Sequence, residues 1–299
     1  MNNSIIVTRF SKKEVDDANK IRFNVNNLWA DNNEPEPDDY YKALEKTQTK
    51  NWYNIAKSEE VKIIEFDKTD TEWMLEALNS YAIMVMMGTD ELQAASTISQ
   101  LFKSQLENTV NKHKNYFPNG NFFVRVERVS LKSGIHGVGP YNNLKNIIGS
   151  IITSTIGHEC ISINDDLERF NIYLFNWNEI KEEFRVFVHN NSITAISTQH
   201  YSQVSNLLKN MNDSDIKINI VNKIVDWFNS NIKDKLSEIV GPNYTMDIAL
   251  LNDNSLYFIE PNCFGANYAA GSALFHWSID HEILCNNTNQ VEFRFVDKE

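Results

Sequence analysis

Residues 244–265 read YTMDIALLNDNSLYFIEPNCFG, and this stretch decides the fold that we expect. Two apolar runs flank the polar tetrapeptide Asn-Asp-Asn-Ser, which is the pattern of a β-hairpin. We expect its two strands over residues 244–251 and 256–261. A two-residue turn at the central Asp-Asn pair would place Asp247 directly opposite Glu260, because both turn residues tolerate positive φ. Side chains two apart on a strand share a face, so Asn262 would join the two acids.

Two carboxylates and an amide oxygen on one face are hard oxygen ligands of the kind that suit Mg²⁺ held against a polyphosphate. The sequence therefore predicts a metal site formed by Asp247, Glu260 and Asn262. In a solvated cleft these acids would stabilise the fold little before the ion binds, and substitution would relieve their repulsion. Two alternatives stay open here. The acids can lie on the solvent face of an ordinary hairpin, and a three-residue turn would shift the register and separate them.

The composition favours a globular protein and excludes several classes of function. The chain has 299 residues, 42% of them hydrophobic, which is enough for one large domain or two closely packed lobes. Its formal net charge of −12 argues against a broad nucleic-acid surface, although a few local cations suffice for a nucleotide. Three widely spaced cysteines, with no secretory signal and no apolar run of membrane-spanning length, predict a cytoplasmic protein.

The order of predicted elements is typical of an α+β fold with mainly antiparallel strand pairing. An acidic, proline-bearing loop is expected over residues 27–39. Expected strands cover residues 61–66, 121–129 and 170–175, and a second hairpin over 183–198 turns at an Asn-Asn pair. Expected helices cover residues 71–87, 90–115, a segment ending near 156, and 215–239.

Cationic side chains on two segments are candidates for phosphate binding. Lys132 lies in a glycine-bearing loop after a predicted strand, where a lysine beside exposed amides can bind phosphate. Arg125 lies on that strand and can face the same phosphates. Arg185 lies two residues after Glu183 on another strand, so Glu183 can orient it towards a cleft. Each has a plainer explanation, namely a flexible connector with an incidental lysine or an exposed ion pair.

Taken in order, five motifs resemble those of an ATP-grasp protein of the type related to cell division cycle protein 123. The motifs are EFRVFV at residues 183–188, ITAIS at 193–197, YTMDIAL, FIEPNCFG, and SALFHW at 272–277. The resemblance covers about the last 180 residues, from Phe122 onward. Each motif alone is weak, but their order and compatible spacing are specific. The Glu-Pro-Asn of the fourth motif departs from the family's Asp-Phe-Asn-Pro order towards the Glu-x-Asn of ATP-grasp ligases.

This resemblance implies a role for each candidate residue. The Mg²⁺ ligands look like Asp247, Glu260 and Asn262, and the phosphate lysine looks like Lys132. Arg125 and Arg185 resemble residues that face the nucleotide or substrate. Arg185, which would stabilise charge on the transferred phosphoryl group, and Lys132 are the expected catalytic residues, and Glu183 beside Arg185 is expected to bind the nucleotide. The segment Tyr173, Leu174 and Phe175, continuing to Trp177, resembles the hinge between lobes at which adenine is held.

The resemblance also implies the domain organisation and the function. We expect an α-rich region with a short strand over residues 1–115, an amino-terminal ATP-grasp lobe over 116–180, and a carboxyl-terminal lobe with the metal site over 181–299. The expected cofactors are ATP and Mg²⁺. The favoured function is an ATP-dependent ligase that joins a carboxylate to an amine or similar nucleophile, acting on a small molecule or a protein. The alternative is an ATP-binding assembly chaperone for a protein partner, such as a translation initiation factor.

Overall fold

The computed structural model describes residues 4–18, 21–24, 37–55, 61–155, 157–162, 167–268, 270–285 and 290–299. The loop expected over residues 27–39 lies almost wholly outside the described residues. Packing divides the chain into two compact units, here called unit 1 (Met1–Lys57 and Asn178–Glu299) and unit 2 (Ser58–Trp177). Each unit contains its own sheet and its own helices, which confirms the α+β class.

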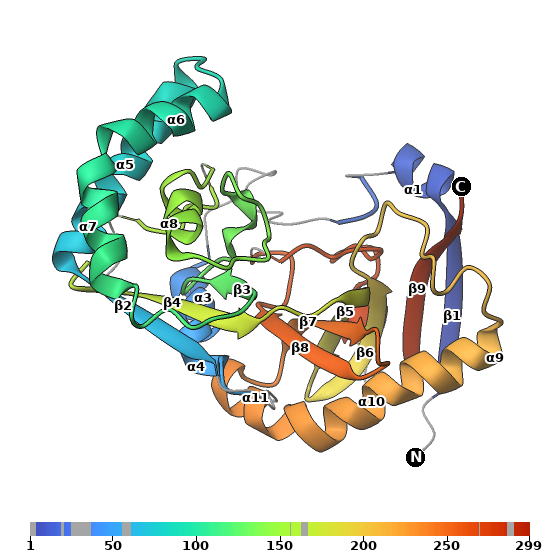
Figure 1. Ribbon diagram of the computed structural model, residues 1–299. Coiled ribbons are helices and arrows are strands. Elements are labelled where there is room, and N and C mark those ends of the chain that lie inside the picture. Colours follow the sequence, from blue (N-terminus) through green and yellow to red (C-terminus); the bar gives the residue numbers. More distant parts are fainter. Residues whose placement is uncertain are drawn as a thin grey trace. The chain divides into compact units, whose positions relative to one another are not determined.

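Unit 1 contains the six-stranded sheet. In Figure 1 its amino-terminal part is blue and its carboxyl-terminal part is yellow to red. Its strands are β1 (Ser4–Ser11), β5 (Ile180–His189), β6 (Ser192–Thr198), β7 (Tyr244–Leu251), β8 (Leu256–Asn262) and β9 (Gln290–Lys298). Its helices are α1 (Lys12–Ala18), α3 (Tyr40–Lys46), α4 (Thr49–Trp52), α9 (Asp213–Ile216), η2 (Lys217–Asn222), α10 (Lys223–Trp227), η3 (Phe228–Ile232), α11 (Lys233–Val240) and α12 (His281–Cys285).

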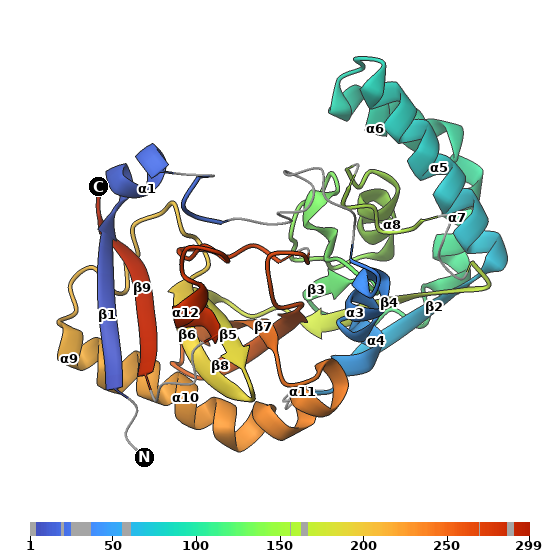
Figure 2. The same ribbon diagram turned by 180° about the vertical axis from the view of Figure 1, so that it is seen from behind.

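The six strands are ordered β1-β9-β6-β5-β7-β8. Strand β9 pairs in parallel with both β1 and β6, whereas the pairs from β6 to β8 are antiparallel, so the sheet is mixed. The sequence patterns did not predict β1, because its partner β9 lies almost 290 residues further along the chain. The beginning and the end of the chain therefore belong to one sheet (Figures 1 and 2).

The β7–β8 hairpin has the expected register between the two acids, but for a different reason. The chain reverses through a three-residue loop: Asn254 N donates to Leu251 O (2.9 Å), Leu251 N donates to Ser255 O (3.0 Å), and Asn254 has a φ of 66°. Next to this loop Leu250 is opposite Leu256. If that register continued along the strands, Asp247 would not be opposite Glu260. A β-bulge beyond Ile248 adds one residue to β8 and restores the pair Asp247–Glu260. The predicted two-residue turn is therefore wrong, whereas the predicted pairing of the acids is confirmed.

The second hairpin, β5–β6, turns as expected. Asn190 and Asn191 have φ values of 49° and 59°, the left-handed conformation that the two central residues of a type I′ turn require. Asparagine tolerates this conformation better than most residues, and the Asn-Asn pair was the signal in the sequence. The turn brings β5 and β6 side by side with His189 opposite Ser192.

A helical segment over residues 213–240 runs along the six-stranded sheet from its β1 side towards its β8 side (Figures 1 and 2). It joins α9, α10 and α11 through the π-helical segments η2 and η3. Apolar residues four apart form its buried face: Ile216, Ile220, Ile224, Phe228, Ile232 and Leu236. In the part of the chain that the structure describes, no helix combines the length and apolar character needed to cross a membrane.

Unit 2 is built on a small antiparallel sheet of order β2-β4-β3. Its elements are β2 (Lys62–Asp67), α5 (Lys68–Met86), α6 (Glu91–Leu101), α7 (Lys103–His113), β3 (Phe122–Arg125), η1 (Leu131–Ser133), α8 (Leu144–Ile152) and β4 (Arg169–Asn176). The single helix expected over residues 90–115 is two helices. The buried Phe102 lies between them, after the end of α6 and before the start of α7. Strand β3 is also shorter than expected. Asp90 caps α6 by accepting hydrogen bonds from the amides of Leu92 and Gln93.

A buried acid joins two helices of unit 2. Asp70 of α5 is 4% exposed and accepts hydrogen bonds from Thr109 Oγ1 (2.5 Å) and Lys112 Nζ (2.8 Å) of α7. His113 Nε2 lies 2.9 Å from the same carboxylate. Burial raises the pKa of Asp70, but the hydrogen bonds from Lys112, Thr109 and His113 outweigh it and hold that pKa below its usual value. Asp70 therefore links α5 to α7 as a carboxylate.

We predict that Asp70→Asn lowers the free energy of unfolding by about 2–4 kcal/mol at pH 7, because it leaves buried donors without a charged acceptor. Because the folded pKa lies below the unfolded value of about 3.9, the stabilisation is present above that value and is lost as the pH falls through the folded pKa. The difference between wild type and variant should therefore shrink in acid. Urea unfolding measured from pH 7 to pH 3 tests this. Asp67→Asn is the control, since Asp67 is 57% exposed and bonds the same lysine. Equal stability of the Asp70 variant and wild type at pH 7 would contradict the prediction.

Candidate metal and nucleotide site

A row of polar residues crosses the whole six-stranded sheet of unit 1 on one face. Residues directly opposite one another on paired strands point to the same side, so a chain of such pairs defines a face. From β1 to β8 the row contains Thr8, Arg294, Ser197, Arg185, Asp247 and Glu260. The residues that alternate with them on the opposite face are buried and apolar: Phe184, Val186, Ile196, Met246, Ile248, Phe293 and Phe295.

A buried ion pair lies at the centre of this row. Arg185 Nε donates to Asp247 Oδ1 (2.9 Å) and Arg185 Nη2 donates to Asp247 Oδ2 (2.7 Å), a bidentate geometry. The two side chains are 8% and 2% exposed. Burial alone would lower the pKa of Arg185, but the charge of Asp247 more than offsets it and the pKa is raised. Asp247 therefore does not face a solvated cleft, and the expectation that it does is wrong.

Glu260 and Asn262 complete the acidic end of the row. Glu260 is directly opposite Asp247 and half-buried, and its charge also raises the pKa of Arg185. Asn262 follows two residues later on β8, and its amide nitrogen lies 3.5 Å from Asp247 Oδ2. The structure thus brings the three predicted metal ligands together on one face.

The donor set fits a hard cation that shares its coordination shell with phosphate oxygens. Carboxylate and amide oxygens are hard ligands, and Asp247, Glu260 and Asn262 would supply them from one face of the sheet. Among the described residues, no group of three or more His, Cys, Asp or Glu side chains could hold a metal ion. The candidate ligands would be two carboxylates and one amide, and Mg²⁺ is commonly held by one or two carboxylates together with substrate phosphates.

The segment that carries the SALFHW motif lies over the middle of the row. Arg185 Nη1 donates to the carbonyl oxygen of Gly271, and Leu274 N donates to Ser197 Oγ (3.2 Å). On the same face, Phe187 packs edge-on against Phe275, with ring centroids 5.2 Å apart. Polar side chains of the sheet thus form hydrogen bonds with backbone groups of this segment. We call residues 270–285 the strap.

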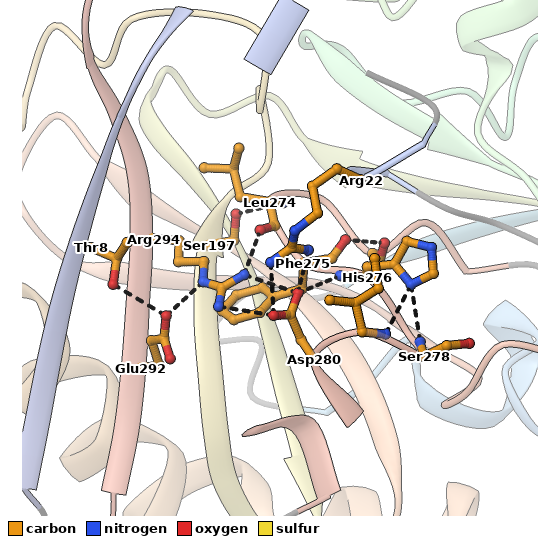
Figure 3. Close-up of polar contacts among 12 residues, drawn as sticks. Thr8, Arg22, Ser197, Leu274, Phe275, His276, Ser278, Asp280, Glu292 and Arg294 are labelled. Atoms are coloured by element: carbon orange, nitrogen blue, oxygen red, sulfur yellow. Dashed lines mark hydrogen bonds and ion pairs between the residues drawn. The ribbon is translucent and has the colours of Figure 1, made fainter. Parts of the chain in front are cut away.

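Figure 3 shows a second buried ion cluster that holds the other end of the strap. Asp280 accepts from Arg294 Nη1 (3.0 Å) and Nη2 (3.1 Å), and from Arg22 Nη1 (2.5 Å) and Nη2 (2.8 Å). Arg294 also donates to Leu274 O (3.1 Å), and its guanidinium lies 4.0 Å from the centroid of the Phe275 ring. Burial raises the pKa of Asp280, but hydrogen bonds from Arg22 and Arg294 outweigh it and hold the pKa low.

Sequence reasoning missed this cluster, because its members lie in three distant segments. Arg22 follows α1, Asp280 lies in the strap and Arg294 lies on β9. The only available signal was the position of Asp280, which lies three residues after the SALFHW motif.

The remaining site candidates lie on β5 and in unit 2. Glu183 precedes Arg185 by two residues on β5, on the same face. Register pairs place Arg125 opposite Tyr173 and Phe123 opposite Phe175, so these four side chains share one face of the small sheet. Leu174 points to the other face, where it belongs to the hydrophobic core of unit 2.

The predicted hinge segment and phosphate lysine have different surroundings. Tyr173 is 2% exposed and donates a hydrogen bond to Glu127 (2.6 Å), and the chain passes from unit 2 to unit 1 directly after Trp177. Lys132 lies in the short 3-10 helix η1 and is exposed. Arg125, in contrast, is 4% exposed.

Comparison with known proteins identifies the fold. Residues 155–299 match the family described as D123. A C-terminally truncated Cdc123 from Schizosaccharomyces pombe has a TM-score of 0.55 and 17% sequence identity, over 86% of this chain and 98% of that one. The fold is that of Cdc123. A second structure of Cdc123 from the same organism has a TM-score of 0.53 and 18% identity, over the same shares.

Other comparisons add no argument about function. N5-carboxyaminoimidazole ribonucleotide synthetase from Thermotoga maritima has a TM-score of only 0.28 and 14% identity, over 52% of this chain and 34% of that one. No curated protein matches the sequence significantly. The similarity to Cdc123 spans both units and therefore includes residues that precede the D123 match.

We predict that Asp247→Asn destabilises the ligand-free protein by about 3 kcal/mol or more, because it leaves the Arg185 guanidinium buried without its counter-charge. Glu260→Gln, at a half-buried position, should cost less than about 1 kcal/mol. Urea unfolding of both variants without nucleotide or metal measures the difference. If Asp247→Asn matches or exceeds the stability of wild type, the buried pair does not stabilise the fold.

Proposed function

We propose that this chain is a Mg·ATP-binding protein that acts on a protein partner, as an assembly factor, rather than a ligase with a small-molecule substrate. The observation that carries the nucleotide part is the pairing of Asp247 with Glu260, with Asn262 on the same face. The fold of Cdc123 over 98% of that chain supports the assembly role. The motif resemblance supplies the expected cofactors, ATP and Mg²⁺.

In this proposal, Asp247, Glu260 and Asn262 would hold Mg²⁺, which would neutralise charge on the phosphates. Lys132 and Arg125 contact the phosphates, and Tyr173 and Phe175 contact the adenine. Lys132 is the exposed member of this set, and its compact ammonium group suits phosphate as a point charge. These roles in unit 2 rest on the motif resemblance.

The surroundings of Arg185 suit a positioning role in the proposed site. Two of its side-chain nitrogens donate to Asp247 and the third donates to the carbonyl oxygen of Gly271. Three of the five N–H groups of this guanidinium thus fix it against Asp247 and the strap, an arrangement that suits positioning of a metal ligand. We therefore assign Arg185 a positioning role. Ligase activity, the boundaries at residues 115 and 180, and the cytoplasmic location stay predictions from the sequence.

We predict that millimolar Mg·ATP raises the melting temperature by several degrees. A ligand at a hundred times its Kd adds about 2.7 kcal/mol of stability, and each kcal/mol corresponds to about 2–4 °C for a domain of 150–250 residues. Differential scanning fluorimetry with ATP alone, Mg²⁺ alone and both together measures this. The absence of any shift with Mg·ATP would refute the nucleotide assignment.

Two substitutions separate the phosphate and metal roles. Lys132→Ala should weaken ATP binding with or without Mg²⁺, whereas Glu260→Gln should weaken it chiefly when Mg²⁺ is present. Lys145→Ala is the matched control, since Lys145 is another exposed lysine of unit 2. Isothermal titration of each variant with ATP, with and without Mg²⁺, measures the effect. Wild-type affinity in both test variants would exclude these residues from the site.

The products of ATP turnover distinguish an assembly factor from a ligase. We expect slow ATP hydrolysis that small carboxylates and amines do not stimulate. Stimulated release of ADP together with a new amide product, detected by mass spectrometry, would establish the ligase instead.

A further inference from the structure

The solvent face of α5 is a stripe that changes from acidic to apolar along the helix. Exposed residues recur every three or four positions, which places them on one face of an α-helix. In chain order the stripe contains Glu72, Glu76, Asn79, Ile83 and Met86. The last two are large apolar side chains with exposures of 57% and 73%.

The apolar end of the stripe continues around the turn into α6. Met87, at the end of α5, is 82% exposed, and Leu92, near the start of α6, is 70% exposed. We call Ile83, Met86, Met87 and Leu92 the α5–α6 patch. Figures 1 and 2 both show the α5–α6 turn at the end of the helical arm of unit 2 that lies away from its sheet.

Acidic residues border the α5–α6 patch on both sides. Glu72 and Glu76 precede it on α5, and the exposed Asp90 and Glu91 follow it at the start of α6. Asp90 and Glu91 follow the tight turn after α5, in which Thr89 N donates to Met84 O of α5 (3.0 Å). No lysine or arginine occurs between Lys68 and Lys103.

The combination of apolar surface and negative charge indicates which kind of partner can bind the α5–α6 patch. An anionic membrane surface would be repelled by the four exposed acids. A second copy of the chain, docked through the same patch, would bring like charges together. A protein segment with apolar side chains beside lysine or arginine complements both features. Methionine side chains suit such a surface because they adapt their shape to different partners.

We propose that the α5–α6 patch is a docking surface for a basic amphipathic protein segment, in which apolar anchors contact the patch and flanking cations face its acidic border. The inference rests on the proposed function for the existence of a partner, and it adds the surface and the chemistry of that partner. Exposed apolar surface bordered by polar residues is the usual form of a protein-binding site on a folded domain.

The test uses a fluorescent helical peptide built of leucine and lysine, and its counterpart with glutamate in place of lysine. Fluorescence anisotropy should show binding of the lysine peptide only, with an affinity that falls as salt is added. The double variant Ile83→Ser/Met86→Ser should lose about tenfold or more in affinity, because two apolar contacts are removed. Glu72→Gln/Glu76→Gln should weaken binding and reduce its dependence on salt. Both pairs of positions are exposed, so the fold should be retained.

Ile218→Ser is the matched control, since Ile218 is a 60%-exposed isoleucine of unit 1 and its loss should leave peptide binding unchanged. Equal affinity of wild type and Ile83→Ser/Met86→Ser would overturn the proposal. So would a wild-type dimer that this double variant dissociates in sedimentation, or binding of wild type to phosphatidylserine vesicles that the variant loses. The melting shift with Mg·ATP is measured on the same samples: loss of that shift with intact peptide binding contradicts the nucleotide function alone.

Discussion

The buried ion pair between Arg185 and Asp247 is the interaction on which the candidate site depends. It lies at the centre of the polar row, and Arg185 connects the pair to the strap through Gly271. Removing either charge would leave the other buried without compensation, a cost of about 3–5 kcal/mol in comparable cases. The pair therefore holds the carboxylate of Asp247 in one orientation before any ligand is present. A metal site with a fixed ligand needs less reorganisation when the ion binds.

Buried polar and charged side chains also hold the strap against the sheet. Side chains of the row bind its backbone: Ser197 accepts from Leu274, and Arg294 donates to the carbonyl oxygen of Leu274. Asp280 then joins the strap to Arg22, from the amino-terminal part of the chain. Three arginines and two aspartates thus fix an irregular segment whose polar groups would be costly to bury alone.

The same geometry constrains the chemistry. In the proposed site, Arg185 would orient Asp247 as a ligand for the cation, because it donates two hydrogen bonds to that carboxylate. A protein that binds nucleotide and uses it to control a partner needs such a preformed site, together with a surface for the partner. The α5–α6 patch offers that surface on unit 2.

The sequence by itself determined the local features: the two hairpins, the Asn-Asn turn, the helix over residues 213–240 and the α+β class. It also placed Asp247, Glu260 and Asn262 on one face, although the actual three-residue loop needed a compensating bulge that no residue pattern announced. Only the tertiary structure decided that β1 pairs with β9, that Asp247 is buried against Arg185, and that Arg22, Asp280 and Arg294 meet. The physical reason is that hairpins and helices arise from contacts a few residues apart, which leave a periodic trace in the sequence. Pairings between distant segments leave none, because burial and charge neutralisation are properties of the assembled fold.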